Sequence, residues 1–196
     1  MTNQFGLVLG TVSLLTVGAA AAIGQVNNPT QLTRSFAADS QHRGNTSTGL
    51  VREVRLATEG FRDVTVAMAA GYASTGSCVT GPQEGAMGIH FANGPLIDDG
   101  LLEAQSPELL VYEQQNGRLR LLGVEYLVIA EAWHAHTPTP PVLMGQHFHY
   151  VGSPNRYGLP PFYELHVWAW RDNPHGMFVD WNPVVSCEEF TPDERP

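Results

Sequence analysis

Alternation between apolar and polar positions is clearest in the segment from Phe162 to Trp170. Successive side chains of a β-strand point to opposite faces of the sheet, so one face of this segment carries Glu164 and His166 between aromatic rings. The other face is entirely suited to a protein core. Burying a carboxylate and an imidazole is costly unless each finds a hydrogen-bond partner, an opposite charge or a metal ion. The pattern therefore predicts a strand that carries functional groups into the interior.

A helical periodicity of apolar residues occurs earlier in the chain, before the predicted strands. From Val51 to Ala70 the apolar residues recur at spacings of three and four, which predicts an amphipathic helix. Gly71 is suited to end this helix in a left-handed conformation. The apolar positions are Val54, Ala57, Phe61, Val64 and Met68.

Several short apolar runs follow the helix. The glycine-rich stretch from Gly71 to Gly88 predicts an irregular loop, and Asn116-Gly117 predicts a hairpin turn. The run that follows the turn is apolar on both alternations up to Ile129, which is typical of a central strand. Strands are expected at Met87 to Ala92, Leu109 to Tyr112, Arg118 to Ile129, Leu143 to Val151 and Met177 to Asp180, besides the segment that begins at Phe162.

One helix followed by short strands and hairpin turns predicts an α+β fold. We expect the N-terminal amphipathic helix to pack on a mainly antiparallel, curved or barrel-like β-sheet. The 196-residue chain is long enough for one domain with a core.

The start of the chain differs from the rest. Phe5 to Ile23 carry no charge, and Ala20 and Ala22 offer a processing site, so residues 1–24 resemble a secretory signal peptide. The first basic residue is Arg34, and the apolar run is nearly long enough to span a bilayer, so an uncleaved membrane anchor is the alternative. Residues 25–49 have the composition of a flexible linker. A single domain is expected over residues 50–190, exported to the periplasm or the extracellular space, or membrane-anchored if the first segment is retained.

Net charge and cysteine content further restrict the classes of partner and the compartment that we expect for this protein. A formal net charge of −9 argues against nucleic acid or an anionic membrane surface as a partner, so contact with a membrane is expected only through an uncleaved N-terminal segment. Cys78 and Cys187 are the two cysteines, and in an oxidising compartment they favour one disulfide bond. The alternative is that Cys78 is a nucleophile, which requires a free thiol of lowered pKa.

Ionisable groups with apolar neighbours recur in several of the predicted strands. His90, Glu125, His149 and His166 each lie in mid-strand among apolar neighbours, and they are the candidate metal ligands. His147 and Glu164 are substitutes for any member that faces elsewhere. Imidazole and carboxylate ligands suit a divalent transition metal, namely Zn, Mn, Fe, Ni or Cu, and an open coordination position would allow catalysis on a small-molecule ligand.

Alternatives to this site stay open at the level of the sequence. The histidines could be hydrogen-bonded core residues, and Glu125 could form a buried salt bridge with Arg120 or Arg156. The chain could instead be a non-catalytic module that binds a carbohydrate or another ligand through stacked tryptophans. A structural or assembly role, in which the aromatic face packs against another subunit of a homo-oligomer, is the third reading. The tryptophans concerned are Trp133, Trp168, Trp170 and Trp181.

Four segments resemble a group of exported bacterial proteins of unassigned function. They follow the patterns GAMGxHF at Gly85 to Phe91, VEY at Val124 to Tyr126, FYELHxWxW at Phe162 to Trp170 and DWNPxVSC at Asp180 to Cys187. The resemblance spans roughly residues 71–187. It implies bacterial export and a single domain, and it implies no particular activity.

Overall fold

The structure is a computed structural model that describes residues 49–81 and 83–192. The predicted signal peptide or anchor (1–24) lies outside the described residues, and so does the predicted linker except for its last residue.

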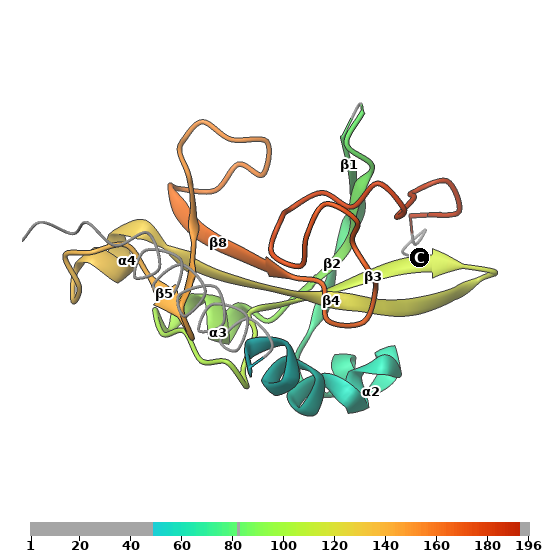
Figure 1. Ribbon diagram of the computed structural model, residues 1–196, viewed down its shortest axis with the longest axis horizontal. Coiled ribbons are helices and arrows are strands. Elements are labelled where there is room, and N and C mark those ends of the chain that lie inside the picture. The colour runs from blue at the N-terminus through green and yellow to red at the C-terminus, as the bar shows by residue number, and fades with distance from the viewer. Residues whose placement is uncertain (1–48, 82, 193–196) are drawn as a thin grey trace, which may run out of the picture. The chain divides into compact units, whose positions relative to one another are not determined.

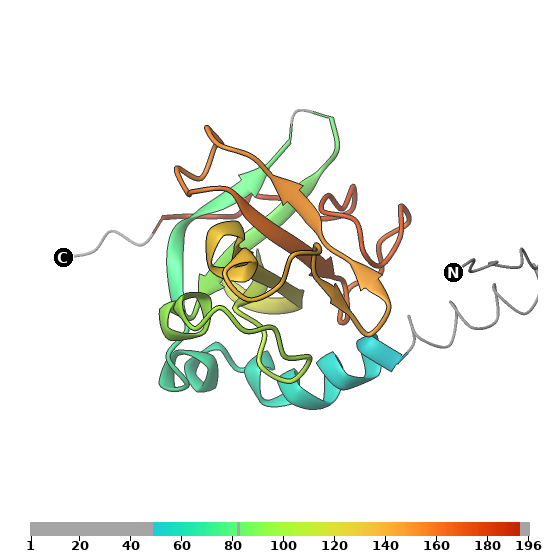
Figure 2. The same ribbon diagram turned by 90° about the vertical axis from the view of Figure 1, so that its left-hand side faces the viewer.

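Six antiparallel strands form the main sheet, in the order β1-β2-β3-β4-β8-β7. The sheet is strongly curled into a half-barrel (Figure 2). This confirms the predicted antiparallel, curved sheet of an α+β protein. The strands are β1 (Ala73–Thr80), β2 (Ala86–Ala92), β3 (Leu109–Gln115), β4 (Arg118–Ile129), β7 (His149–Val151) and β8 (Phe162–Val167).

The predicted hairpin turn joins β3 to β4. Asn116 and Gly117 have φ values of 51° and 70°, the left-handed conformation that a tight hairpin turn requires. Strand β4 lies inside the sheet between β3 and β8, which agrees with its apolar character on both alternations.

The segment predicted as one helix from Val51 to Ala70 is divided in the structure. Residues 49–58 are α-helical, η1 (Glu59–Arg62) is a 3₁₀ turn, and α2 (Val64–Ala69) is a separate short helix. The break occurs at Asp63, which is extended and accepts a hydrogen bond from the backbone N–H of Thr65, so it caps a new helix. Gly71 follows α2 with a φ of 97°, the left-handed conformation expected of it.

Three further expectations need correction. The predicted loop from Gly71 to Gly88 contains edge strand β1, which its serine and threonine residues form by pairing with β2. The predicted strand from Leu143 to Val151 is three pieces: β5 (Val142–Leu143) and β6 (Gln146–His147) form a separate hairpin, and β7 joins the main sheet. Met144 and Gly145 turn this hairpin with φ values of 46° and 82°.

No strand forms at Met177 to Asp180. The backbone carbonyls of this stretch bond to Trp168 instead of to a neighbouring strand. The backbone N–H of Trp168 donates to Met177 O, and its indole Nε1–H donates to Val179 O. Two short helices complete the described elements, α3 (Gly94–Asp98) and α4 (Ala130–His134).

The two faces of the sheet are covered differently. Helical residues 49–58 and α2 lie beneath the sheet in Figure 1, and Leu50 and Val54 join Leu110, Tyr126 and other buried residues in the largest apolar cluster. The segments that follow β7 and β8 lie over the opposite face (Figure 1). Every residue of β8 is buried, so both faces of this strand are inside the protein.

Cys78 on β1 and Cys187 near the end of the chain form a disulfide bond, with Cα atoms 5.7 Å apart. This confirms the predicted pairing, and it leaves no free thiol among the described residues. The bond fixes the C-terminal segment to the edge strand. Within residues 49–81 and 83–192, no helix has both the length and the hydropathy of a membrane span.

Replacing both cysteines with serine is expected to lower the free energy of unfolding by about 4 to 5 kcal/mol, because the bond closes a loop of 109 residues in the unfolded chain. Urea denaturation at neutral pH measures the change. The control is urea denaturation of the wild type in the presence of a reducing agent, and its stability should match that of the variant. Equal stability of the oxidised wild type and the variant would contradict the expectation.

Glu108 is a buried carboxylate that the sequence analysis did not single out. It is 1% exposed, and its Oε2 accepts a hydrogen bond of 3.1 Å from the backbone N–H of Leu127. Burial disfavours its charged form and raises the pKa of Glu108 to about 8. The folded protein therefore holds this carboxyl group neutral at pH values where the unfolded chain ionises it.

A Glu108→Gln variant should lose this pH dependence. In the wild type, the contribution of Glu108 is fully present below about pH 4.5 and declines as pH rises to about 8, by at most about 1.4 kcal/mol per pH unit. The free energy of unfolding of the variant should therefore exceed that of the wild type increasingly across this window, as urea titrations at several pH values can show. The same substitution at exposed Glu131 is the control. A constant difference between Glu108→Gln and wild type would refute the expectation.

Candidate metal centre

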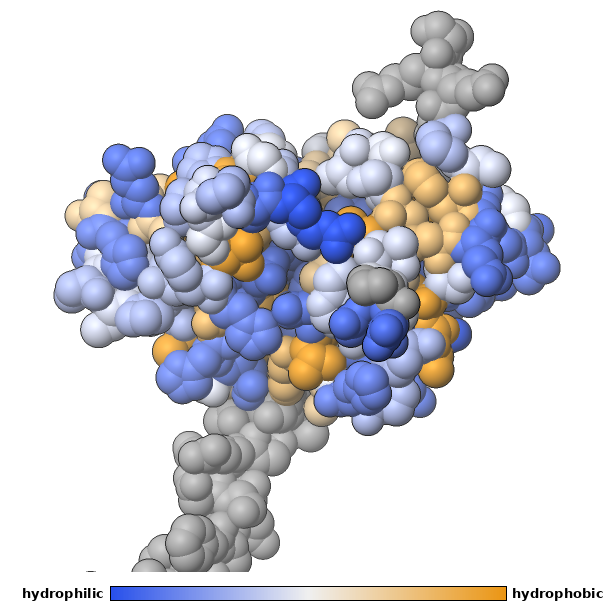
Figure 3. Space-filling model, turned by 90° about the horizontal axis from the view of Figure 1, so that it is seen from above, coloured by the Kyte–Doolittle hydropathy of each residue, from blue (hydrophilic) through white to orange (hydrophobic). Residues whose placement is uncertain are grey.

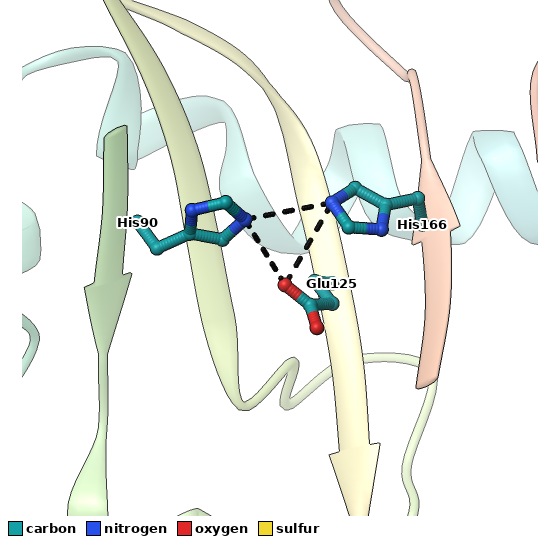
Figure 4. Close-up of side chains that lie close together, drawn as sticks. All are labelled: His90, Glu125 and His166. Carbon is teal, nitrogen blue, oxygen red and sulfur yellow. Dashed lines mark hydrogen bonds and ion pairs between the residues drawn. The ribbon is translucent and has the colours of Figure 1, made fainter. Parts of the chain in front are cut away.

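Three side chains from three strands meet on the face of the sheet opposite the helices. His90 comes from β2, Glu125 from β4 and His166 from β8 (Figure 4). All three are at most 5% exposed. The sequence placed these groups in separate strands, and the structure brings them together.

The three facing atoms form a compact triangle. Glu125 Oε2 lies 3.1 Å from His90 Nε2 and 3.7 Å from His166 Nε2, and the two nitrogens are 3.5 Å apart. A triangle with these sides has its centre about 2.0 Å from each corner, the length of a bond from zinc to a histidine nitrogen or a carboxylate oxygen. The donor atoms therefore fit one transition-metal ion without rearrangement, and a fourth coordination position would stay open.

Curvature of the sheet is what makes the three side chains meet. His90 and His166 belong to strands that are three steps apart in the sheet, which on a flat sheet would separate them by about 14 Å. Glu125 pairs directly with His166. His90 pairs with Val111, which in turn pairs with Gly123, so His90 is offset by two residues along the sheet and lies on the same face as Glu125. The curled sheet makes this face concave, and the imidazoles point toward each other.

Gly123 permits the chain to close over this face. A Cβ atom at this position would lie 2.2 Å from Val167 O and 3.1 Å from Trp168 Cα, so only glycine allows the approach. Beyond Val167 the chain turns, and the ring of Trp168 stacks on His166 with centroids 6.0 Å apart. The indole thus covers one side of the imidazole.

The charge on Glu125 depends on its neighbours. Burial disfavours its ionised form, but the imidazoles of His166 and His90 and a hydrogen bond with Glu164 outweigh burial, so the pKa of Glu125 lies below its ordinary value. Burial, followed by the negative charges of Glu125 and Asp180, raises the pKa of Glu164 to about 9. At neutral pH, Glu164 is protonated, and its O–H donates a hydrogen bond to the Glu125 carboxylate.

His166 has the protonation state that a metal ligand needs. Burial lowers the pKa of His166, against the opposing pull of Glu125 and Asp180, and so favours the neutral imidazole in which a ring nitrogen can bind an ion. Its Nδ1 is the one buried side-chain nitrogen or oxygen of residues 49–81 and 83–192 that has no hydrogen-bond partner. Asp180 Oδ1 faces this nitrogen at 3.8 Å. Carboxylates in this position orient metal-bound histidines in many proteins.

The fourth predicted ligand, His149, is placed elsewhere. It is exposed, lies on edge strand β7, and its Nδ1 is 3.2 Å from Asp180 Oδ1. It forms a neighbouring group with Glu164 and Asp180 and does not join the triangle. The substitute His147 is exposed on β6, outside the main sheet, whereas the substitute Glu164 adjoins the triangle.

Asp180 is a member of the site that sequence reasoning missed. It was expected in a strand, and only the turn of the chain after β8 brings it to His166. The proposed salt bridge of Glu125 with Arg120 or Arg156 does not form: within the part of the chain that the structure describes, the ion pairs of Glu125 are those with His90 and His166.

A cavity of about 390 Å³ opens beside the triangle. His90 and Glu125 line it, together with apolar side chains such as Leu109, Leu127 and Phe162. Figure 3 shows the molecule of Figure 1 as seen from its upper side. Hydrophilic residues cover most of this surface, and hydrophobic areas lie between them. The cavity gives a small molecule access to two of the three donor residues.

The tryptophans are distributed over the molecule. Trp168 is buried against His166, Trp170 donates to Thr58 Oγ1 on the helical side, Trp133 donates to Thr139 O, and Trp181 lies under the guanidinium of Arg156. Among the described residues, the ring contacts join no two tryptophans.

No family model, curated protein or solved structure matches this chain. The functional reading therefore depends on the geometry of the site.

Asp180→Asn is expected to weaken metal binding at the triangle by about 10-fold to 100-fold, because His166 loses the carboxylate that faces its Nδ1. Competition titration with a chromogenic zinc chelator measures the affinity. Asp172→Asn, which changes an exposed side chain, is the matched control. If Asp180→Asn and Asp172→Asn bind zinc as tightly as wild type, Asp180 has no role in positioning His166.

Proposed function

We propose that this protein binds a divalent transition-metal ion through His90, Glu125 and His166 and presents it to a small molecule in the adjoining cavity. The observation that carries the proposal is the triangle of Nε2, Nε2 and Oε2 atoms, whose centre lies about 2.0 Å from each of them.

The surroundings of the three residues support this reading over a purely structural one. The hydrogen-bond partner of His166 Nε2 is His90 Nε2 at 3.5 Å, a long contact, and Glu125 Oε2 is farther away at 3.7 Å. Among the described residues, Nδ1 has no partner. A buried imidazole that lacks good partners at both nitrogens destabilises the fold. A metal ion bound at Nε2 would supply a strong interaction to this side chain and so offset the cost of its poor hydrogen bonding.

The chemistry of the ion would depend on the open position. A metal with three protein ligands can polarise an oxygen of a bound molecule or activate a water. Glu164, protonated beside Glu125, is a proton donor within the site. We propose metal-assisted chemistry on a small molecule as the activity that this arrangement supports.

The disulfide favours a location outside the reducing cytoplasm, because structural disulfides persist in oxidising compartments. We therefore infer that the protein is exported.

Metal-free protein titrated with zinc, manganese, iron(II), nickel or copper should take up about one equivalent of at least one of them at this three-ligand site. His90→Ala, Glu125→Gln and His166→Ala should each weaken that binding by more than about 100-fold, the upper end of what removal of a supporting residue causes. Elemental analysis after dialysis and calorimetric titration measure these quantities.

His147→Ala, which removes an exposed histidine, is the matched control. Far-UV circular dichroism of each metal-free variant shows whether it is folded, and Glu125→Gln preserves side-chain shape where the histidine truncations leave space. Wild-type protein that retains less than about a tenth of an equivalent of every metal tested would refute the proposal.

A further inference from the structure

Among the described residues that line the cavity beside the proposed metal site, Arg156 is the one with a permanently cationic side chain. Its Nη2 donates a hydrogen bond of 3.2 Å to Thr80 O, and its guanidinium lies 5.7 Å from the ring centroid of Trp181. These contacts hold the side chain at the cavity. Over residues 49–81 and 83–192, no ion pair joins Arg156 to a carboxylate.

An arginine without a carboxylate partner keeps most of its five N–H donors available. Its planar guanidinium matches a carboxylate group, which can accept two parallel hydrogen bonds from it. The guanidinium brings a positive charge to this cavity in a chain whose formal charge is −9, and that charge favours an anionic ligand there.

Other wall residues indicate the body of the ligand. The apolar side chains Leu109, Leu127, Leu159 and Phe162 line the same cavity and suit a hydrocarbon chain or an aromatic ring. A volume of about 390 Å³ lies within the range of small-molecule sites.

Tyr157 adds a neutral hydrogen-bond donor. Its hydroxyl has a thioether, Met87 Sδ at 3.5 Å, as its neighbour, which is a weak acceptor. A ligand oxygen would replace this weak contact with a stronger one.

We propose that this cavity binds a small carboxylic acid with an apolar body, whose carboxylate is recognised by Arg156 and whose body lies between the apolar walls beside His90 and Glu125. The inference rests on the proposed function, because it assigns a ligand class to the same metal-adjoining site.

The probes are 3-phenylpropionate, its primary amide and acetate, titrated calorimetrically into zinc-loaded and zinc-free protein. Phenylpropionate should bind the zinc-loaded protein. The amide, which has the same shape without the charge, should bind at least about tenfold more weakly, and so should acetate, which lacks the apolar body.

Arg156→Gln should weaken phenylpropionate binding at least about tenfold while leaving zinc binding unchanged. Arg118→Gln, which changes an exposed arginine outside this cavity, is the matched control and should bind the probe as wild type does.

The outcomes separate the two proposals. Zinc uptake without phenylpropionate binding, equal affinity for the amide, or an Arg156→Gln variant with wild-type affinity overturns the carboxylate proposal and leaves the metal proposal intact. Absence of metal uptake refutes the metal proposal, and titration of phenylpropionate into the zinc-free protein then decides by the same Arg156→Gln comparison whether the cavity recognises carboxylates.

Discussion

The interior of this protein holds a carboxylate between two imidazoles. Glu125 would be strongly disfavoured as a buried anion if it stood alone, and it is ionised because His90, His166 and a protonated Glu164 surround it. Each of these partners comes from a strand of the same sheet. The site therefore exists only when β2, β4 and β8 are in register, so the chemistry and the fold depend on one arrangement.

The two faces of the sheet have different roles, and this difference allows polar groups to be buried on one of them. The face toward the helical residues 49–58 and α2 carries the largest apolar cluster, which includes Leu110, Val124 and Tyr126. Strand β4 contributes Val124 and Tyr126 to that core and Glu125 to the opposite face, as the alternation of a strand requires. Polar groups can occupy one face because hydrophobic burial on the other supplies stability.

The segments that close over the site are held by specific contacts. Asn182 pairs its backbone with Ala86 of β2, and the disulfide joins Cys187 to β1. Between β8 and these anchors, the chain brings Trp168 and Asp180 to His166. Arg156 and Tyr157 approach the same face from the loop before β8. The concave sheet thus provides the metal donors, and the covering loops provide the groups that orient a histidine and line the cavity.

The sequence by itself determined the antiparallel sheet, its main strands and the three ionisable residues that meet inside it. Alternation in Phe162 to Trp170 and apolar residues on both sides of Glu125 were sufficient, because burial of a charged group in a strand is visible in the pattern. Only the tertiary structure decided which candidates converge. His149 has the same local pattern as His166, but β7 is the edge strand, and its histidine turns to Asp180 near the surface. Asp180 and Arg156 lie in irregular segments, where no periodicity reports direction, so their approach to the site depends on long-range contacts that a local pattern does not encode.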